Sequence, residues 1–260
     1  MPQIVSTFAV YIAIFLFGMI VIRIGLESIS KEKLKSMVIT LTKTPLRGLL
    51  IGVIASGLLQ SSSAVLVLTV GLVASGYLTF QQSLGVVLGV NIGTNSTLEL
   101  LTLDVGSYVP VLLVVGAIFM MSKNKFFFGI GGLIFGFGCI FVAMSGFESM
   151  ADPLSSQAFV RHFIEQTDDN LLFGVGIGTI FTAMIQSSTA TAGIVMGFLN
   201  HEAITLPAAI AVVLGANIGT CVTAMLASIG ANIEAKLVAY AHVWLNIFGV
   251  VLFFPLIHKL

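Results

Sequence analysis

Two short polar runs in this sequence each interrupt a long apolar stretch. The first run spans residues 60–63 and the second spans residues 186–189, and both begin Gln-Ser-Ser. Hydroxyl groups donate hydrogen bonds, and the free backbone N–H groups at the start of a helix attract anions. A helix that begins just after each run would make the pair a cradle for a phosphate-like anion. The predicted anion ligands are Gln60, Ser61, Ser62, Ser63, Gln186, Ser187, Ser188 and Thr189.

Charge compensation for such an anion is the next requirement. No lysine or arginine lies close in sequence to either run, and Arg23 is expected at the membrane edge, so the cradle should consist of neutral groups. Cations that bind together with the anion would supply the missing charge. Neutral oxygen ligands suit an alkali cation such as sodium, especially at unwound helix ends. The predicted sodium ligands are Gln60, Gln186, Asn91, Thr94, Thr97, Asn217, Thr220 and Thr223.

The two polar runs belong to two copies of a longer segment. Residues 46–94 align without a gap on residues 172–220, and 19 of the 49 aligned positions are identical. In each copy an Asn-Ile-Gly-Thr motif begins 31 residues after the glutamine. The predicted organisation is a first repeat over about residues 8–104, a linking helix over 108–121, a second repeat over about 126–230 and a final helix over 237–257.

The composition indicates that the elements holding these motifs lie in lipid. Of the 260 residues, 57% are hydrophobic and only 8% are charged, whereas soluble domains carry about 25% charged residues. The mean hydropathy is +1.10. We therefore predict an all-α polytopic membrane protein with a single transmembrane domain over residues 1–260. The formal net charge of zero gives no support to nucleic-acid binding, and no cofactor is predicted beyond the coupling ions.

The helical arms beside each polar run are too short to cross a bilayer. Residues 46–59 would form a helix about 21 Å long and residues 64–75 one about 18 Å long, against roughly 30 Å of hydrocarbon. We expect each pair of arms to form a re-entrant hairpin, and the alternative is one continuous helix with a polar middle. Each repeat should also contain a broken helix around its Asn-Ile-Gly-Thr motif.

Re-entrant hairpins also give a consistent distribution of charge. They place the basic loops, including Lys123 and Lys125, on one side and most of the acidic residues on the other. This satisfies the positive-inside rule with the N-terminus outside. The two repeats would then have inverted topologies, an architecture that is common among secondary transporters.

Together these motifs resemble the sodium/phosphate cotransporter family, which includes bacterial relatives of the type II animal phosphate transporters. The resemblance covers almost the entire chain. It rests on residues 15–19, 60–64, 89–94, 186–190 and 215–220, and on an Ala-His-x-x-Leu-Asn element at residues 241–246. The resemblance implies sodium-driven phosphate uptake, with the paired polar runs as the substrate and sodium site.

Two other transport functions fit the same residues. The site could serve symport of another oxyanion, or the polar loops could line a passive ion channel. An enzyme is not expected, because no histidine or lysine recurs beside the serines to act as a base.

Overall fold

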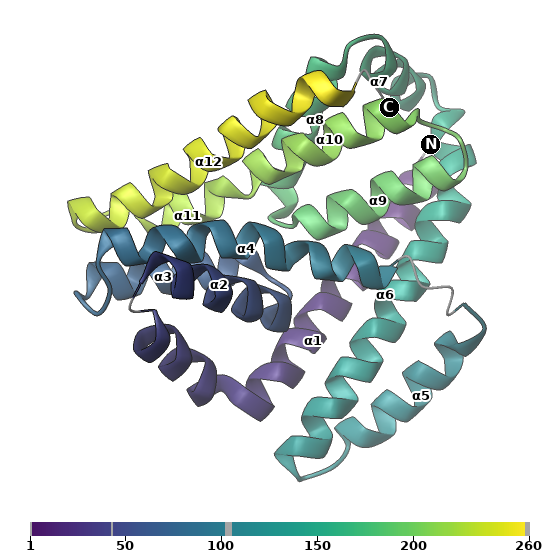
Figure 1. Cartoon of the computed structure of the whole chain (residues 1–260). Coiled ribbons are helices and arrows are strands. Elements are labelled where there is room, and N and C mark those ends of the chain that lie inside the picture. Colours follow the sequence, from purple (N-terminus) through teal and green to yellow (C-terminus); the bar gives the residue numbers. More distant parts are fainter. Residues whose placement is uncertain (1, 43, 102–105, 258–260) are drawn as a thin grey trace.

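The computed structural model consists of α-helices joined by short connections, with a single 3₁₀ turn, over the residues that it describes (Figure 1). These residues are 2–42, 44–101 and 106–257, without the side chains of residues 30–41, 96–98, 100 and 101. No β-strand occurs in that part of the chain. A helix satisfies its backbone hydrogen bonds within one segment, which a lipid environment requires. The all-α class expected from the sequence is confirmed.

Four segments of the described chain are long and apolar enough to cross a bilayer. They lie in α1 (Pro2–Leu41), α6 (Lys125–Ser155), the consecutive helices α10 (Leu206–Gly219) and α11 (Cys221–Ala227), and α12 (Ile233–Ile257). On α12, Trp244, Phe248 and Leu252 follow one another at four-residue spacing, and each is more than half exposed. An exposed stripe of large apolar side chains suits lipid rather than water.

Two helical hairpins carry the polar runs. The first hairpin consists of α2 (Pro45–Leu59) and α3 (Ser62–Ala74), and the second consists of α8 (Leu171–Ile185) and α9 (Ser188–Asn200). The first arms have 15 residues each and the second arms have 13 each. The hairpins are therefore equivalent in length as well as in sequence. The predicted helix breaks are present, and the continuous-helix alternative is wrong.

The first arm of the first hairpin packs parallel to the helix that follows the hairpin, α4 (Phe80–Leu101). A Cβ atom on Gly89 would lie 2.1 Å from the carbonyl oxygen of Leu49, and one on Gly93 would lie 2.3 Å from that of Val53. Both distances are below 3.0 Å, which is closer than Cβ atoms in real structures come to other atoms. Glycine therefore permits a close approach of backbones, which is a common way for helices to associate in lipid.

The second repeat reproduces this contact between α8 and α10. A Cβ atom on Gly215 would lie 2.0 Å from the carbonyl oxygen of Val175, and one on Gly219 would lie 2.5 Å from that of Thr179. Each of these four positions is 126 residues after its counterpart in the first repeat. The duplication is therefore visible in the packing that holds each hairpin as well as in the motifs.

The helices that precede the two hairpins, α1 and α6, pack against each other in opposite directions. A Cβ atom on Gly18 would lie 2.7 Å from the carbonyl oxygen of Gly136, and one on Gly25 would lie 2.6 Å from that of Gly129. Increasing residue numbers on α1 therefore meet decreasing numbers on α6. Figure 1 shows the two helices side by side, with the start of α1 and the end of α12 at the end of the molecule that carries α7 (Ala158–Asp169).

The predicted broken helix is absent from the first repeat, where α4 runs without interruption through the motif at residues 91–94. Gly93 serves there to let α2 approach, and the helical hydrogen bonding continues past it. In the second repeat a break exists, because Thr220 separates α10 from α11, yet its φ of −66° and ψ of −19° remain helical. The expectation of a broken helix in the first repeat was wrong.

The remaining helices lie close to their predicted positions. α5 (Val109–Met120) corresponds to the predicted linking helix and follows a 3₁₀ turn over Gly106–Tyr108. The final helix begins four residues earlier than predicted. The side chain of Asn232 caps it by accepting a hydrogen bond from the backbone N–H of Ala235.

Candidate functional site

Each hairpin reverses direction at a glutamine in the left-handed backbone conformation. Gln60 has φ 50° and ψ 30°, and Gln186 has φ 57° and ψ 24°. This conformation costs a residue with a side chain roughly 1–2 kcal/mol, and glycine adopts it without that cost. In both tips the amide side chain of the glutamine forms a hydrogen bond with its own hairpin arm.

The serine that follows each glutamine caps the second arm of its hairpin. The Oγ atom of Ser61 accepts a hydrogen bond from the N–H of Ala64, and that of Ser187 accepts one from the N–H of Ala190, both at 3.2 Å. Accepting this bond leaves the hydroxyl proton available for donation. The first N–H groups of α3 and α9 have no partner within their helices and carry the positive end of the helix dipole.

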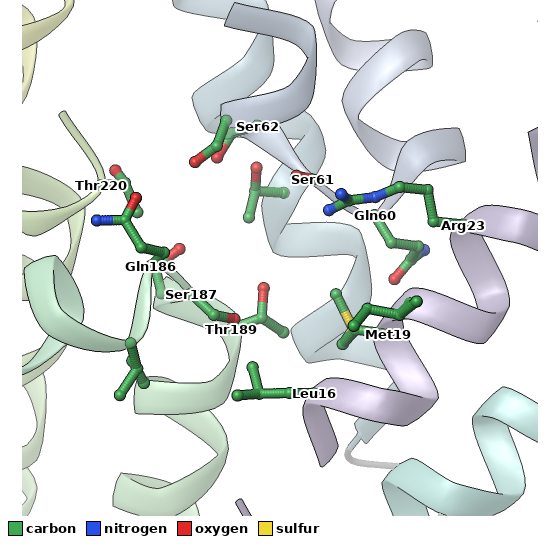
Figure 2. A pocket seen from close by; sticks show the side chains of 15 residues that line it. Leu16, Met19, Arg23, Gln60, Ser61, Ser62, Gln186, Ser187, Thr189 and Thr220 are labelled. Carbon is green, nitrogen blue, oxygen red and sulfur yellow. The ribbon is translucent and has the colours of Figure 1, made fainter. Parts of the chain in front are cut away.

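Both tips line a single cavity of about 300 Å³ (Figure 2). Its walls come from α1, the two hairpin tips and the threonines of the two Asn-Ile-Gly-Thr motifs. The lining residues are Leu16, Met19, Ile20, Arg23, Gln60, Ser61, Ser62, Ser63, Thr94, Ile185, Gln186, Ser187, Ser188, Thr189 and Thr220. All eight predicted anion ligands are therefore brought together, although they lie in segments 126 residues apart.

Apart from the capping Ser61 and Ser187, the hydroxyl groups of the cavity fall into two chemical kinds. Those of Ser62, Ser63, Ser188 and Thr189 make no hydrogen bond with any other described residue, so they can donate to a ligand. Thr94 and Thr220 differ from them, as their protons are already committed within their own helices.

These two threonines occupy equivalent positions in the two repeats. Thr94 donates to the carbonyl oxygen of Val90, and Thr220 donates to that of Asn217, each at 2.7 Å. A hydroxyl that donates in this way presents only lone pairs to a ligand. Thr94 and Thr220, both predicted sodium ligands, therefore line the cavity with oxygen atoms that can only accept.

The amide groups of the tip glutamines are held in the same way in both hairpins. Nε2 of Gln60 donates to the carbonyl oxygen of Gly57 at 2.9 Å, and Nε2 of Gln186 donates to that of Ala183 at 2.7 Å. The Oε1 atom of Gln186 accepts a hydrogen bond of 2.5 Å from Thr223. Thr223 thus contacts the tip, although it does not line the cavity. The side chain of Thr97, its counterpart, lies outside the described part.

The two asparagines predicted as sodium ligands do not line the cavity. Asn91 joins α4 to α12, because its Nδ2 donates to Oδ1 of Asn246 at 3.0 Å and its Oδ1 lies 3.3 Å from Nε2 of His242. The side chain of Asn217 is exposed. Asn91 and Asn217 therefore lie outside the cavity that Thr94 and Thr220 line, and Asn91 has a role in packing.

Comparison with known proteins agrees with this geometry. The sequence model of Na⁺/Pi-cotransporters matches the chain twice, over residues 14–149 and over residues 146–259. The chain belongs to the Na⁺/Pi-cotransporter family. The double match supports the internal repeat, and membership places the protein among membrane transporters rather than enzymes.

Three relatives illustrate the range of this cotransporter family. "Uncharacterized protein YqeW" of Bacillus subtilis is 36% identical over 97% of the chain and 82% of its own length. "Putative inorganic phosphate export protein YjbB" of Escherichia coli is 26% identical over 96% of the chain, but the chain spans 46% of that protein. "Sodium-dependent phosphate transport protein 2B" of Homo sapiens is 33% identical over 39% of the chain and 16% of its own length. No solved structure gives a significant match.

The cavity of this cotransporter-family protein contains a charge that the sequence did not lead us to expect. Arg23 lines it, so the prediction of a cradle made only of neutral groups was wrong. Proximity in sequence is a poor guide here, because α1 reaches the cavity from 37 positions before Gln60. Helical spacing in the sequence could have indicated that Arg23 faces the cavity, because Leu16, Met19 and Arg23 fall on one face of α1.

Proposed function

We propose that this protein carries inorganic phosphate across the membrane together with sodium ions by alternating access. The observation that carries the proposal is the convergence of both Gln-Ser-Ser tips on one cavity. The family name gives the two solutes, and family membership supports phosphate transport in general. A cavity of about 300 Å³ is at the small end of ligand pockets, which suits an inorganic ion.

The proposed division of labour follows from the two kinds of hydroxyl group. Phosphate would accept hydrogen bonds from Ser62, Ser188 and the N–H groups at the starts of α3 and α9. Sodium would take oxygen ligands from Thr94, Thr220 and the tip glutamines. Ions of opposite charge in one cavity stabilise each other, and this mutual stabilisation is the physical basis of coupling.

Alternating access rests on the proposed inverted topology of the repeats. The equivalent helices α1 and α6 run in opposite directions, and in Figure 1 the bases of the two hairpins lie at opposite ends of the molecule. We propose that both hairpins are re-entrant and meet at mid-membrane. Movement of one repeat against the other would then open the cavity to each side in turn.

The proposed orientation has the N-terminus outside, on the positive-inside rule. Lys123 and Lys125 would then lie inside, and Glu148, Asp168 and Glu202 outside.

The direction of transport is set by gradients in a symporter, since every step is reversible. The name of YjbB describes export by that protein. We propose that an inward sodium gradient drives uptake through the present protein, and that a reversed gradient drives efflux.

Reconstituted protein tests the proposal directly. Proteoliposomes should accumulate labelled phosphate under an inward sodium gradient and should lose it when the gradient is reversed. Accumulation should stop when potassium replaces sodium on both sides. Uptake that is equal with potassium would defeat the coupling. Sulfate or arsenate accumulated in preference to phosphate would favour the other-oxyanion alternative, and non-saturating ion currents would favour a channel.

A variant links this activity to the cavity. Gln186→Ala removes an oxygen that Thr223 now bonds and that sodium would use, so sodium-driven uptake should be lost while the protein stays monodisperse. Glu165→Ala, on exposed α7, is a matched control and should transport normally. Full activity in Gln186→Ala would remove that glutamine from the site.

A further inference from the structure

One face of α1 forms a wall of the cavity and carries a single charged residue. Leu16, Met19 and Ile20 supply the apolar part of this face, and Arg23 continues it one helical turn later. Figure 2 shows the guanidinium group of Arg23 reaching from α1 towards Ser61 at the tip of the first hairpin.

The guanidinium group lacks a partner among the described residues. Its Nε atom is buried, and neither this atom nor any other part of Arg23 bonds a residue of the described chain. None of the described carboxylates lines the cavity. An arginine stays protonated in proteins, and a charge partly removed from water without a counter-ion is costly. The arrangement is stabilised when an anion enters the cavity.

The charge also breaks the symmetry of the two repeats. The Gly-x-Glu-Ser motifs that begin at residues 25 and 146 align Arg23 with Met144. Met144 is buried in a core cluster with Phe15 and Ile194. The two tips are alike in backbone and hydroxyl groups, so within the described chain only the first tip has a cation beside it.

We propose that Arg23 binds the transported oxyanion through its guanidinium fork, on the side of the cavity next to Ser61. The inference rests on the proposed function and names the residue that sets where the anion binds. A planar guanidinium group can present two parallel N–H donors to two oxygens of a tetrahedral anion, which the ammonium group of lysine cannot do.

A fixed positive charge changes the coupling as well as the affinity. Arg23 supplies part of the charge that sodium would otherwise have to supply. Phosphate should therefore bind measurably to the purified protein in potassium buffer, with sodium strengthening the binding. Removing the charge should make binding weaker overall and more dependent on sodium.

Thermal unfolding of purified protein with and without inorganic phosphate tests this inference. Phosphate that binds the native state raises the unfolding temperature according to its concentration relative to Kd. Arg23→Met, which copies the residue of the second repeat, should weaken phosphate binding on the order of 10-fold to 100-fold. Arg23→Lys keeps the charge without the fork and should fall between wild type and Arg23→Met. Arg47→Gln removes an exposed arginine away from the cavity and should match wild type.

The same experiment distinguishes binding from a structural role. Without phosphate, Arg23→Met should be at least as stable as wild type, because it removes a partly buried charge that has no partner among the described residues. A variant that is less stable without phosphate, or that does not fold, would assign Arg23 a structural role and overturn the inference. Unchanged phosphate binding in Arg23→Met would overturn it too.

Failure of the proposed function gives a different result. If wild-type protein shows no stabilisation by phosphate even with sodium present, both proposals fall. If wild type binds phosphate with sodium and Arg23→Met binds it equally well, only the role of Arg23 is refuted.

Discussion

The contact between α2 and α4 allows a sharp test of how the first hairpin is held. Gly89→Ala adds one methyl group where its carbon would lie 2.1 Å from the carbonyl oxygen of Leu49 and 2.8 Å from the backbone nitrogen of Val53. Real Cβ atoms essentially never come closer than 3.0 Å, so the first distance must grow by at least 0.9 Å. Both neighbouring atoms belong to backbone, which cannot rotate out of the way. The arm that carries Gln60 must therefore move.

The size of the effect follows from two opposing terms. Overpacking a close contact costs about 1–3 kcal/mol. An alanine that fits without strain stabilises a helix by about 0.4–1 kcal/mol relative to glycine. A methyl group added to Gly71 on α3 would meet no described atom within 4 Å, so Gly71→Ala is the matched control. The same substitution at the two sites should differ in unfolding free energy by roughly 1.5–4 kcal/mol.

Thermal unfolding in detergent measures the difference, and labelled-phosphate uptake reports the displaced tip. Gly89→Ala should lower the unfolding temperature and reduce uptake, whereas Gly71→Ala should leave uptake intact and the unfolding temperature unchanged or higher. Gly215→Ala, with 2.0 Å to the carbonyl oxygen of Val175, should reproduce the loss in the second repeat. If Gly89→Ala is as stable and as active as Gly71→Ala, the hairpin is not held by this contact.

Three further predictions concern the site, its surroundings and the orientation. Ser62→Ala and Ser188→Ala each remove a hydroxyl donor from the cavity. Each should weaken phosphate binding about 5-fold, because one lost hydrogen bond costs about 1 kcal/mol. Unchanged affinity in both variants would mean that side-chain hydroxyls do not hold the anion. Asn246→Ala leaves the Nδ2 group of Asn91 without its acceptor and should lower the unfolding free energy by about 1–3 kcal/mol without changing phosphate specificity. Equal stability would show that this hydrogen bond contributes nothing. Lys123→Cys and Glu202→Cys should react with an impermeant thiol reagent from opposite sides of the membrane. The background labelling should be low, because both native cysteines are buried. Labelling of both variants from the same side would refute the proposed orientation.

Much of the fold follows from the sequence by direct physical argument. The composition excludes a water-facing surface, and the alignment of residues 46–94 with 172–220 identifies the duplication. The arms predicted over residues 46–59 and 64–75 could be recognised as short because helix length is proportional to residue number. The continuity of α4 could not be judged in the same way, because Gly93 allows the backbone of Val53 to approach, which is a contact between helices.

The site was only partly accessible to the same reasoning. The tip residues and Thr94 and Thr220 are equivalent in both repeats, so duplication drew attention to them. Asn91 has an equivalent too, Asn217, yet Asn91 bonds α12, which lies outside both repeats. Symmetry in the sequence therefore identified candidates without distinguishing ligands from packing residues.

The sequence by itself determined the lipid environment, the helical class, the duplication and the polar tips, because each depends on composition or on local spacing along the chain. Only the tertiary structure decided that the two tips share one cavity and that Arg23 adds a positive charge to its wall. Which face of α1 meets the tips depends on how its glycines pack against α6, and that contact joins segments more than 100 residues apart.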